Sequence, residues 1–135
     1  MDFDPQQIQA RLAGYFPGEL GIEIVEASMT QARGRLTATK RHLHPGGFVH
    51  GGVWVSLADS VAAWATIPNL ADGHDFSTAE MKTNLFGVAR KGDVLEAVAS
   101  PLHVGRRTQA WEVRVTVDDR LGALFICTQV IVQRS

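Results

Sequence analysis

One carboxylate stands alone in a long apolar segment. From His50 to Ile67 the sequence reads HGGVWVSLADSVAAWATI, and Asp59 is its only ionised side chain when the histidine is neutral. A segment that is apolar nearly all round indicates a buried helix, and Pro68 would end it. Carboxylates are rarely fully buried unless paired, because desolvating the charged form is costly. Asp59 is therefore either a partner in a buried polar network or a functional group.

The segment that leads into this helix, from His44 to Gly52, is rich in glycine. Such a segment leaves backbone N–H groups free at the helix N-terminus, where the positive end of the helix dipole also lies. Donors of this kind stabilise the oxyanion that forms when a carbonyl is attacked. A donor at Gly51 and a carboxylate at Asp59 together indicate acyl chemistry.

Helix geometry separates these two groups within one chain. Eight residues at ~1.5 Å each place Gly51 and Asp59 ~12 Å apart along the axis. Both would have to reach one carbonyl carbon, within ~3 Å of each. Two copies packed antiparallel bring the start of one helix to the middle of the other. If both groups act, the protein is at least a dimer with sites between subunits.

Composition is that of an ordinary soluble globular domain. The 135 residues are 45% hydrophobic and 20% charged, and the net charge is -1. This balance favours neither nucleic acid nor a membrane surface as a partner. No run reaches the ~18 apolar residues of a membrane span, and the acidic start, residues 1–5, lacks the apolar core of a signal peptide. We expect a cytoplasmic protein.

Histidines and the single cysteine suggest no metal site. His42, His44 and His50 do not have a recognised ligand spacing, and no acids or cysteines cluster with them. We expect neither a metal nor a cofactor, and the favoured role of His50 is to brace the start of the helix through the backbone. Cys127 lies in an apolar run, which is typical of a buried structural thiol.

Periodicity predicts an α+β chain forming one domain over residues 1–135. Residues 1–20 hold a short helix, from about Pro5 to Ala13, and a turn at 16–18. Strands follow at 22–28 and 31–39, then the long helix, then strands at 76–86, 93–104, 108–117 and 121–133. Hairpin-length turns imply antiparallel pairing. A curved antiparallel sheet would wrap the apolar helix.

Four motifs carry a resemblance to a known family. They are His44-Pro45-x-Gly47-x-x-His50-Gly51-Gly52, Asp59 nine places after His50, the segment TAEMKTNLF at 78–86, and VGRRT at 104–108. In these the chain resembles the acyl-CoA thioesterases of the hotdog superfamily. The most similar branch holds the phenylacetate-degradation thioesterase and the Arthrobacter-type 4-hydroxybenzoyl-CoA thioesterase.

The resemblance implies a hotdog fold, an antiparallel sheet wrapped around one long central helix. It implies hydrolysis of an acyl-CoA, aromatic in this branch, by a homodimer or a homotetramer made of two dimers. The Gly51 N–H would bind the thioester carbonyl, and Asp59 of the other subunit would act as nucleophile or general base. Thr78 matches a residue that places the water. His44 stands where the family has a carboxamide, so it could donate a hydrogen bond or titrate.

Further residues are expected to bind the substrate. Arginine pairs with phosphate in bidentate fashion, which suits CoA, although solvated turn charges are the alternative. Aromatic side chains would line an acyl pocket, although core packing is favoured for Trp54 and Trp64. The expected set is His50, Gly52, Phe48, Trp54, Asn84, Phe86, Arg90, Arg106 and Arg107. After Phe86 the chain lacks the Arg-Pro that the family commonly has.

Two other functions on the same fold stay open. One is a non-catalytic module that binds or senses acyl-CoA, which would tolerate Asp59→Asn. The other is a hydratase or dehydratase of acyl thioesters, which would release no free thiol. Aliphatic acyl groups and an acyl-carrier-protein substrate also remain alternatives.

Overall fold

The computed structural model describes residues 4–135, so the first three residues of the acidic start lie outside it. Helix α1 (Pro5–Arg11) begins at Asp4, whose side chain accepts a hydrogen bond from the Gln6 N–H at 2.9 Å. This is the predicted N-cap followed by proline. The helix ends a little before the predicted Ala13.

A second short helix, α2 (Phe16–Leu20), replaces the turn predicted at 16–18. That prediction was wrong because Pro17 falls in the first helical turn, where its missing N–H costs nothing. Gly21 then ends the helix at φ 86° and donates its N–H to the carbonyls of Gly18 and Pro17. The first twenty residues therefore hold two helices.

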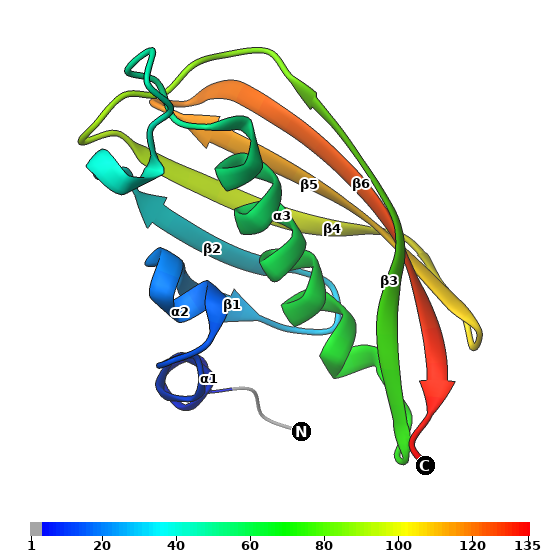
Figure 1. Cartoon of the computed structure of the whole chain (residues 1–135). Coiled ribbons are helices and arrows are strands. Elements are labelled where there is room, and N and C mark those ends of the chain that lie inside the picture. The colour runs from blue at the N-terminus through cyan, green and yellow to red at the C-terminus, as the bar shows by residue number, and fades with distance from the viewer. Residues whose placement is uncertain (1–3) are drawn as a thin grey trace.

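One antiparallel sheet follows, in the order β1-β2-β4-β5-β6-β3 (Figure 1). The strands are β1 (Glu23–Ala27), β2 (Ala32–Thr37), β3 (His74–Leu85), β4 (Val94–Val104), β5 (Thr108–Val117) and β6 (Arg120–Gln133). All six predicted strands are confirmed, with small differences at their ends. Asp118 and Asp119 join β5 to β6 with φ of 50° and 62°. Positive φ at both residues is what a two-residue type I′ hairpin turn requires.

Helix α3 (Gly51–Thr66) lies across the inner face of this curved sheet (Figure 1). The short 3-10 turns η1 (Lys40–His42) and η2 (Ile67–Asn69) precede and follow it. Its buried face, with Trp54, Leu57 and Val61, packs against alternate side chains of β5 such as Trp111 and Val113. This is the predicted hotdog architecture. Among residues 4–135, no helix has the length and apolarity that crossing a membrane requires.

Helix α3 is not buried all round, contrary to the expectation from its apolar sequence. One strip stays half-exposed because α2 and β3 flank it without covering it (Figure 1). The strip consists of Val55, Ser56, Asp59, Ser60 and Ala63. Its two hydroxyls donate to helix carbonyls one turn back, from Ser56 to Gly52 and from Ser60 to Ser56, each at 2.7 Å. Both hydroxyl hydrogens are therefore used within the helix, and the one charge on the strip is the Asp59 carboxylate.

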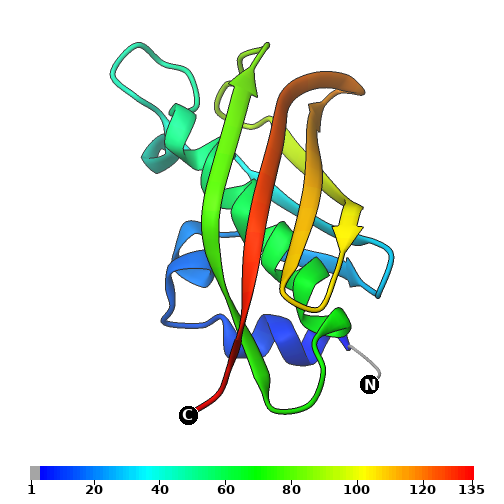
Figure 2. The same cartoon turned by 90° about the vertical axis from the view of Figure 1, so that its right-hand side faces the viewer.

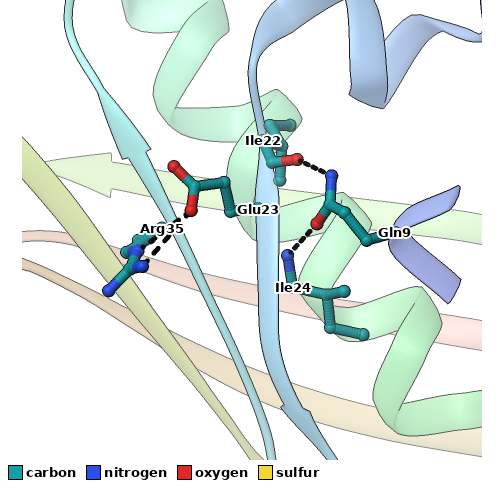
Figure 3. A network of polar contacts seen from close by, with 5 residues as sticks. All are labelled: Gln9, Ile22, Glu23, Ile24 and Arg35. Atoms are coloured by element: carbon teal, nitrogen blue, oxygen red, sulfur yellow. Dashed lines mark hydrogen bonds and ion pairs between the residues drawn. The ribbon is translucent and has the colours of Figure 1, made fainter. Parts of the chain in front are cut away.

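The two edges of the sheet differ. At the β1 edge, the side chain of Gln9 from α1 makes hydrogen bonds that a further strand would otherwise make. Its Nε2 donates to the Ile22 carbonyl at 3.2 Å, and its Oε1 accepts from the Ile24 N–H at 2.8 Å (Figure 3). The opposite edge is β3, which runs beside β6 and has no further strand on its outer side within residues 4–135 (Figure 2). Only the β1 edge is covered.

Candidate active site

Asp59 lines an open depression of about 400 Å³. The depression runs along the half-exposed strip of α3 between α2 and β3. Phe16 and Pro17 line it from α2, Met81 from β3 and Trp64 from α3. Apolar walls around one carboxylate are typical of a site that binds an organic substrate and acts on it.

Thr78 is the polar neighbour of Asp59. Its Oγ1 on β3 lies 3.4 Å from Asp59 Oδ1 and 2.7 Å from Gln129 Oε1 on β6. Burial raises the pKa of Asp59 above its ordinary 3.8, and the Thr78 hydrogen bond opposes that rise. A carboxylate with a raised pKa is a stronger base than an exposed one, which suits it to remove a proton from water.

Sequence reasoning missed Gln129. It is fully buried, and its Nε2 has no hydrogen-bond partner among the described residues. The inward positions of β6 alternate through Ala123, Phe125 and Cys127 to Gln129, so a carboxamide follows three apolar residues on the buried face. A polar residue at an inward-facing position of the alternating strand pattern is the signal that would have identified Gln129.

The N-terminus of α3 offers one free donor. His50 caps the helix: its Nδ1 accepts from the Gly52 N–H at 2.9 Å, and its carbonyl accepts from the Val53 N–H at 2.9 Å. This is the bracing role favoured for His50. The Gly51 N–H has no partner within residues 4–135, and Leu85 of β3 lies next to this glycine.

Three residues of the expected set lie together: His44 and Phe48 in the loop before α3, and Arg90 in the loop between β3 and β4. The ring centroids of His44 and Phe48 are 6.0 Å apart, and the Arg90 guanidinium lies 4.9 Å above the Phe48 ring. His44 Nδ1 accepts from the Gly46 N–H at 2.9 Å, so Nε2 is the nitrogen left for a ligand. We refer to His44, Phe48 and Arg90 as the loop cluster.

His42 has a structural position. It is buried, its Nδ1 accepts from the Thr39 N–H at 2.8 Å, and its Nε2 donates to the Leu20 carbonyl at 2.6 Å. The ring thereby joins α2 to η1. Within residues 4–135, no three His, Cys, Asp or Glu side chains are grouped as metal ligands would be.

Other expected residues lie away from the depression. Trp54 is 2% exposed and packs in the core against Gly122. Asn84 is exposed and accepts a hydrogen bond from Lys82 at 3.0 Å, and the exposed Phe86 follows β3. The structure does not bring Trp54, Asn84 or Phe86 to Asp59 within one chain.

The expected arginines lie near opposite ends of α3. Arg90 belongs to the loop cluster at the N-terminal end. Arg106 lines a second depression of about 420 Å³ with Asn69, which follows the C-terminal end of α3, and the exposed Arg107 is its neighbour in sequence. One chain therefore does not assemble all three arginines into a single phosphate site.

Gly51 and Asp59 are also apart within one chain. Both belong to α3, which is continuous from Gly51 to Thr66. The rise of an α-helix places their backbones ~12 Å apart, which is too far for one carbonyl group to contact both. Within a single chain the Gly51 N–H and the Asp59 carboxylate therefore lie in separate places.

Comparison with known proteins agrees with this chemistry. A family model described as the Thioesterase superfamily matches residues 46–123. The 1,4-dihydroxy-2-naphthoyl-CoA hydrolase of Listeria monocytogenes is 30% identical over 110 residues, which are 81% of this chain and 89% of that protein.

Solved structures share the fold. A point mutant of the phenylacetic acid degradation protein PaaI of Thermus thermophilus superposes with a TM-score of 0.80 at 27% identity, covering 85% of this chain and 96% of that one. A thioesterase of Haemophilus influenzae superposes with a TM-score of 0.92 at 23% identity, covering 98% and 93%. The matched family segment contains both Gly51 and Asp59. The chain therefore belongs to the Thioesterase superfamily and is a thioester hydrolase.

Proposed function

We propose that the protein hydrolyses an acyl-CoA to the free acid and CoA. The observation that carries this proposal is the half-buried Asp59 carboxylate, which lies in an apolar depression with the Thr78 hydroxyl beside it. The Listeria relative is named as the hydrolase of an aromatic acyl-CoA, and the Thermus relative as a phenylacetic acid degradation protein. We therefore propose an aromatic acyl group, as in the branch that the motifs resemble.

The proposed reaction needs one donor and one base. The Gly51 N–H binds the thioester oxygen and stabilises the negative charge that develops there. Asp59 takes a proton from water as the water oxygen bonds to the carbonyl carbon. The C–S bond then breaks, and the proton passes to the departing CoA sulfur. In the alternative, Asp59 attacks the carbonyl itself and water cleaves the resulting anhydride.

We propose that each site combines groups from two subunits. The separation of Gly51 and Asp59 on one helix supports this, as does the uncovered edge of β3. Next to that edge Met81, Leu85 and Phe86 are 44%, 48% and 62% exposed, and exposed apolar side chains beside an unpaired strand favour an interface there. Pairing at β3 would set two α3 helices antiparallel. A tetramer of two such dimers stays an expectation from the resemblance.

The same pairing gives the other residues their proposed roles. The loop cluster would lie near the substrate of its own Gly51, with His44 Nε2 and Arg90 facing the ligand. Arg106 and Arg107 would come from the far end of a neighbouring α3 to meet CoA phosphates. Phe48, Asn84 and Phe86 would border the CoA channel, while Gly52 and His50 hold the donor in place.

A thiol-release assay tests the proposed function. Native protein should cleave at least one of phenylacetyl-CoA, 4-hydroxybenzoyl-CoA and hexanoyl-CoA, with an aromatic ester preferred. Asp59→Asn should lower kcat by about a hundredfold or more, because it removes the base while keeping shape and binding. Asp72→Asn, an exposed aspartate in the loop before β3, is the matched control and should keep native activity.

Each alternative has its own outcome in this assay. If native protein cleaves no ester faster than Asp59→Asn does, the hydrolytic proposal fails. Tight binding of the esters without turnover would instead identify a binding module. Loss or gain of a double bond in the acyl group, without free thiol, would identify a hydratase or dehydratase.

A further inference from the structure

The Thr78 hydroxyl has two acceptors for one hydrogen. In the structure, the carbonyl end of Gln129 lies 2.7 Å from Thr78 Oγ1, and Asp59 Oδ1 lies 3.4 Å from it. A hydroxyl donates one hydrogen at a time, and the shorter contact takes it. In this arrangement the hydrogen bond from Thr78 to the Asp59 carboxylate is weaker than the one to Gln129.

Gln129 has a second orientation that removes this competition. Its amide is fully buried, and the Nε2 that points away from Thr78 has no partner among the described residues. A buried donor without an acceptor destabilises the fold, because it has lost its hydrogen bonds to water. The two ends of a carboxamide have nearly the same shape, so a half-turn of the amide places Nε2 where Oε1 lies, within hydrogen-bond distance of Thr78 Oγ1.

We propose that Gln129 is a positioning residue of the hydrolytic site. Its amide N–H donates to Thr78 Oγ1 and so directs the Thr78 hydroxyl hydrogen at Asp59. The three groups form a one-way chain, from amide N–H to hydroxyl to carboxylate, in which each hydrogen bond strengthens the next. The inference rests on the proposed role of Asp59 as the base or nucleophile.

Strand pairing fixes this chain in place. Thr78 on β3 lies directly opposite Gln129 on β6, which in turn lies opposite Gln109 on β5. The two glutamines are 0% and 1% exposed, so both belong to one buried polar row beneath α3. They differ in their contacts: Gln109 Oε1 accepts from the Trp111 indole N–H at 3.0 Å, and Gln109 has no bond to Thr78. Gln109 is therefore a matched control for Gln129.

Few other charges act on Asp59. Burial and the nearby Asp59 charge raise the pKa of the Cys127 thiol on β6 to about 11. The thiol therefore stays neutral at the pH values where Asp59 titrates. The depression receives only uncharged side chains from α2 and β3. The charged residues of these elements, which are Glu19 on α2 and Asp75, Glu80 and Lys82 on β3, are exposed. The titratable His74 at the start of β3 lines a different depression. A change in the Asp59 titration therefore reports on its hydrogen-bond chain.

The test replaces Gln129 by methionine, which has a similar length and no amide donor. Removing the donor frees the Thr78 hydrogen to turn away from Asp59, so the ionised carboxylate loses stabilisation. The acid limb of the pH profile of kcat/KM for phenylacetyl-CoA should move up by about 0.5 to 1 pH unit. Activity on the neutral plateau should change less than threefold, and Gln109→Met should leave the limb in place.

Two further variants keep the inference falsifiable. In a Thr78→Val background, Gln129→Met should add no further shift, because the connecting hydroxyl is gone. If Gln129→Met does not fold, Gln129→Asn serves in its place, since the shorter amide withdraws from Thr78 and should shift the limb in the same direction. Carboxyl-carbon NMR of Asp59 gives its titration directly and needs no turnover.

Two results would overturn the inference. A downward shift in Gln129→Met would mean that the carbonyl end holds the Thr78 hydrogen and that Gln129 opposes ionisation. An unchanged titration with a lower melting temperature would mean that Gln129 only fills the core. If native protein cleaves no ester, the proposed function fails, while the NMR titration still decides the role of Gln129.

Discussion

At the scale of single residues, Asp59 has two opposing requirements. Water is partly excluded from it, which disfavours the charge, and yet the proposed reaction needs the charged form. Thr78 compensates part of that cost, and the raised pKa of Asp59 shows that compensation is incomplete. The ionised Asp59 is therefore less stable and more basic than an exposed aspartate.

Asp59→Asn should stabilise the protein at neutral pH. Since the pKa is raised in the folded state, folding is favoured while the carboxyl is protonated, and that benefit is lost as pH rises from below 3.8 through the folded-state pKa. At pH 7 the variant should melt about 1 to 4 °C higher than native protein. At pH 3 the difference in melting temperature should vanish, because Asp59 of the native protein is then protonated in both the folded and the unfolded state.

Differential scanning calorimetry at the two pH values checks this. Asp72→Asn, whose carboxylate is exposed, should change the melting temperature little at either pH. A gain for Asp59→Asn that is equally large at pH 3 would show that packing, and not the buried charge, limits stability at this position.

Sequence reasoning found the residues whose type is unusual for their surroundings. Asp59 is a charge among apolar residues, and Gly51 stands at the start of a helix, so both could be selected without coordinates. Gln129 could not be selected in the same way, because its contact with Thr78 joins residues 51 positions apart. Only the register of β3 against β6 shows that the two side chains meet.

At the scale of elements, α3 lies unusually close to two strands. A Cβ on Gly34 of β2 would lie 2.7 Å from Val61 Cγ2, and one on Gly122 of β6 would lie 2.6 Å from the Trp54 ring. Real Cβ atoms do not approach so closely, so both positions need glycine. These two glycines set the depth at which the helix lies in the sheet, and with it the position of Asp59.

Gly34→Ala should lower the free energy of unfolding by about 1–3 kcal/mol, because the added methyl overpacks the helix–sheet contact. Urea unfolding measures the loss. Gly87→Ala is the control, since its Cβ would meet nothing closer than 3.4 Å and its φ is not positive. Equal stability of the two variants would show that α3 can move away from the sheet at little cost.

The strands and α3 were predictable because their periods persist over many residues. Trp111, Val113, Val115 and Val117 alternate inward along β5 as the pattern predicts. Helix α2 was not predictable, because it is shorter than two turns and contains proline and glycine. Its conformation depends on tertiary contacts such as the bond from His42 to the Leu20 carbonyl, which no local pattern shows.

At the scale of the whole molecule, the proposed sharing of sites between subunits can be tested by complementation between two inactive variants. Gly51→Pro removes the donor N–H from the first helical position, where proline is favoured. His50 already has the extended conformation that precedes proline, with φ -60° and ψ 139°. Gly51→Ala keeps the N–H and adds a similar contact with Leu85, so it is the matched control.

Gly51→Pro and Asp59→Asn should each be inactive as pure proteins. After unfolding and refolding together, mixed dimers hold one site with both the native glycine and the native aspartate. Random pairing should restore about a quarter of native activity. Gly51→Ala should stay active alone.

Two outcomes would contradict shared sites. No recovery, with mixed dimers present in native mass spectrometry, would place both groups of each site in one chain. A protein that is active as a strict monomer in analytical ultracentrifugation would contradict sharing altogether.

The buried Cys127 is a natural probe of local opening of the folded structure, because its thiol reacts only when it becomes exposed. It is the only cysteine in the sequence and lies 1% exposed on β6, opposite Trp111 of β5 and Met81 of β3. Since its pKa is raised to about 11, the folded state presents no thiolate to a maleimide dye. Dye attaches only when the structure opens around Cys127, so the labelling rate under native conditions measures the free energy of that opening without an engineered probe.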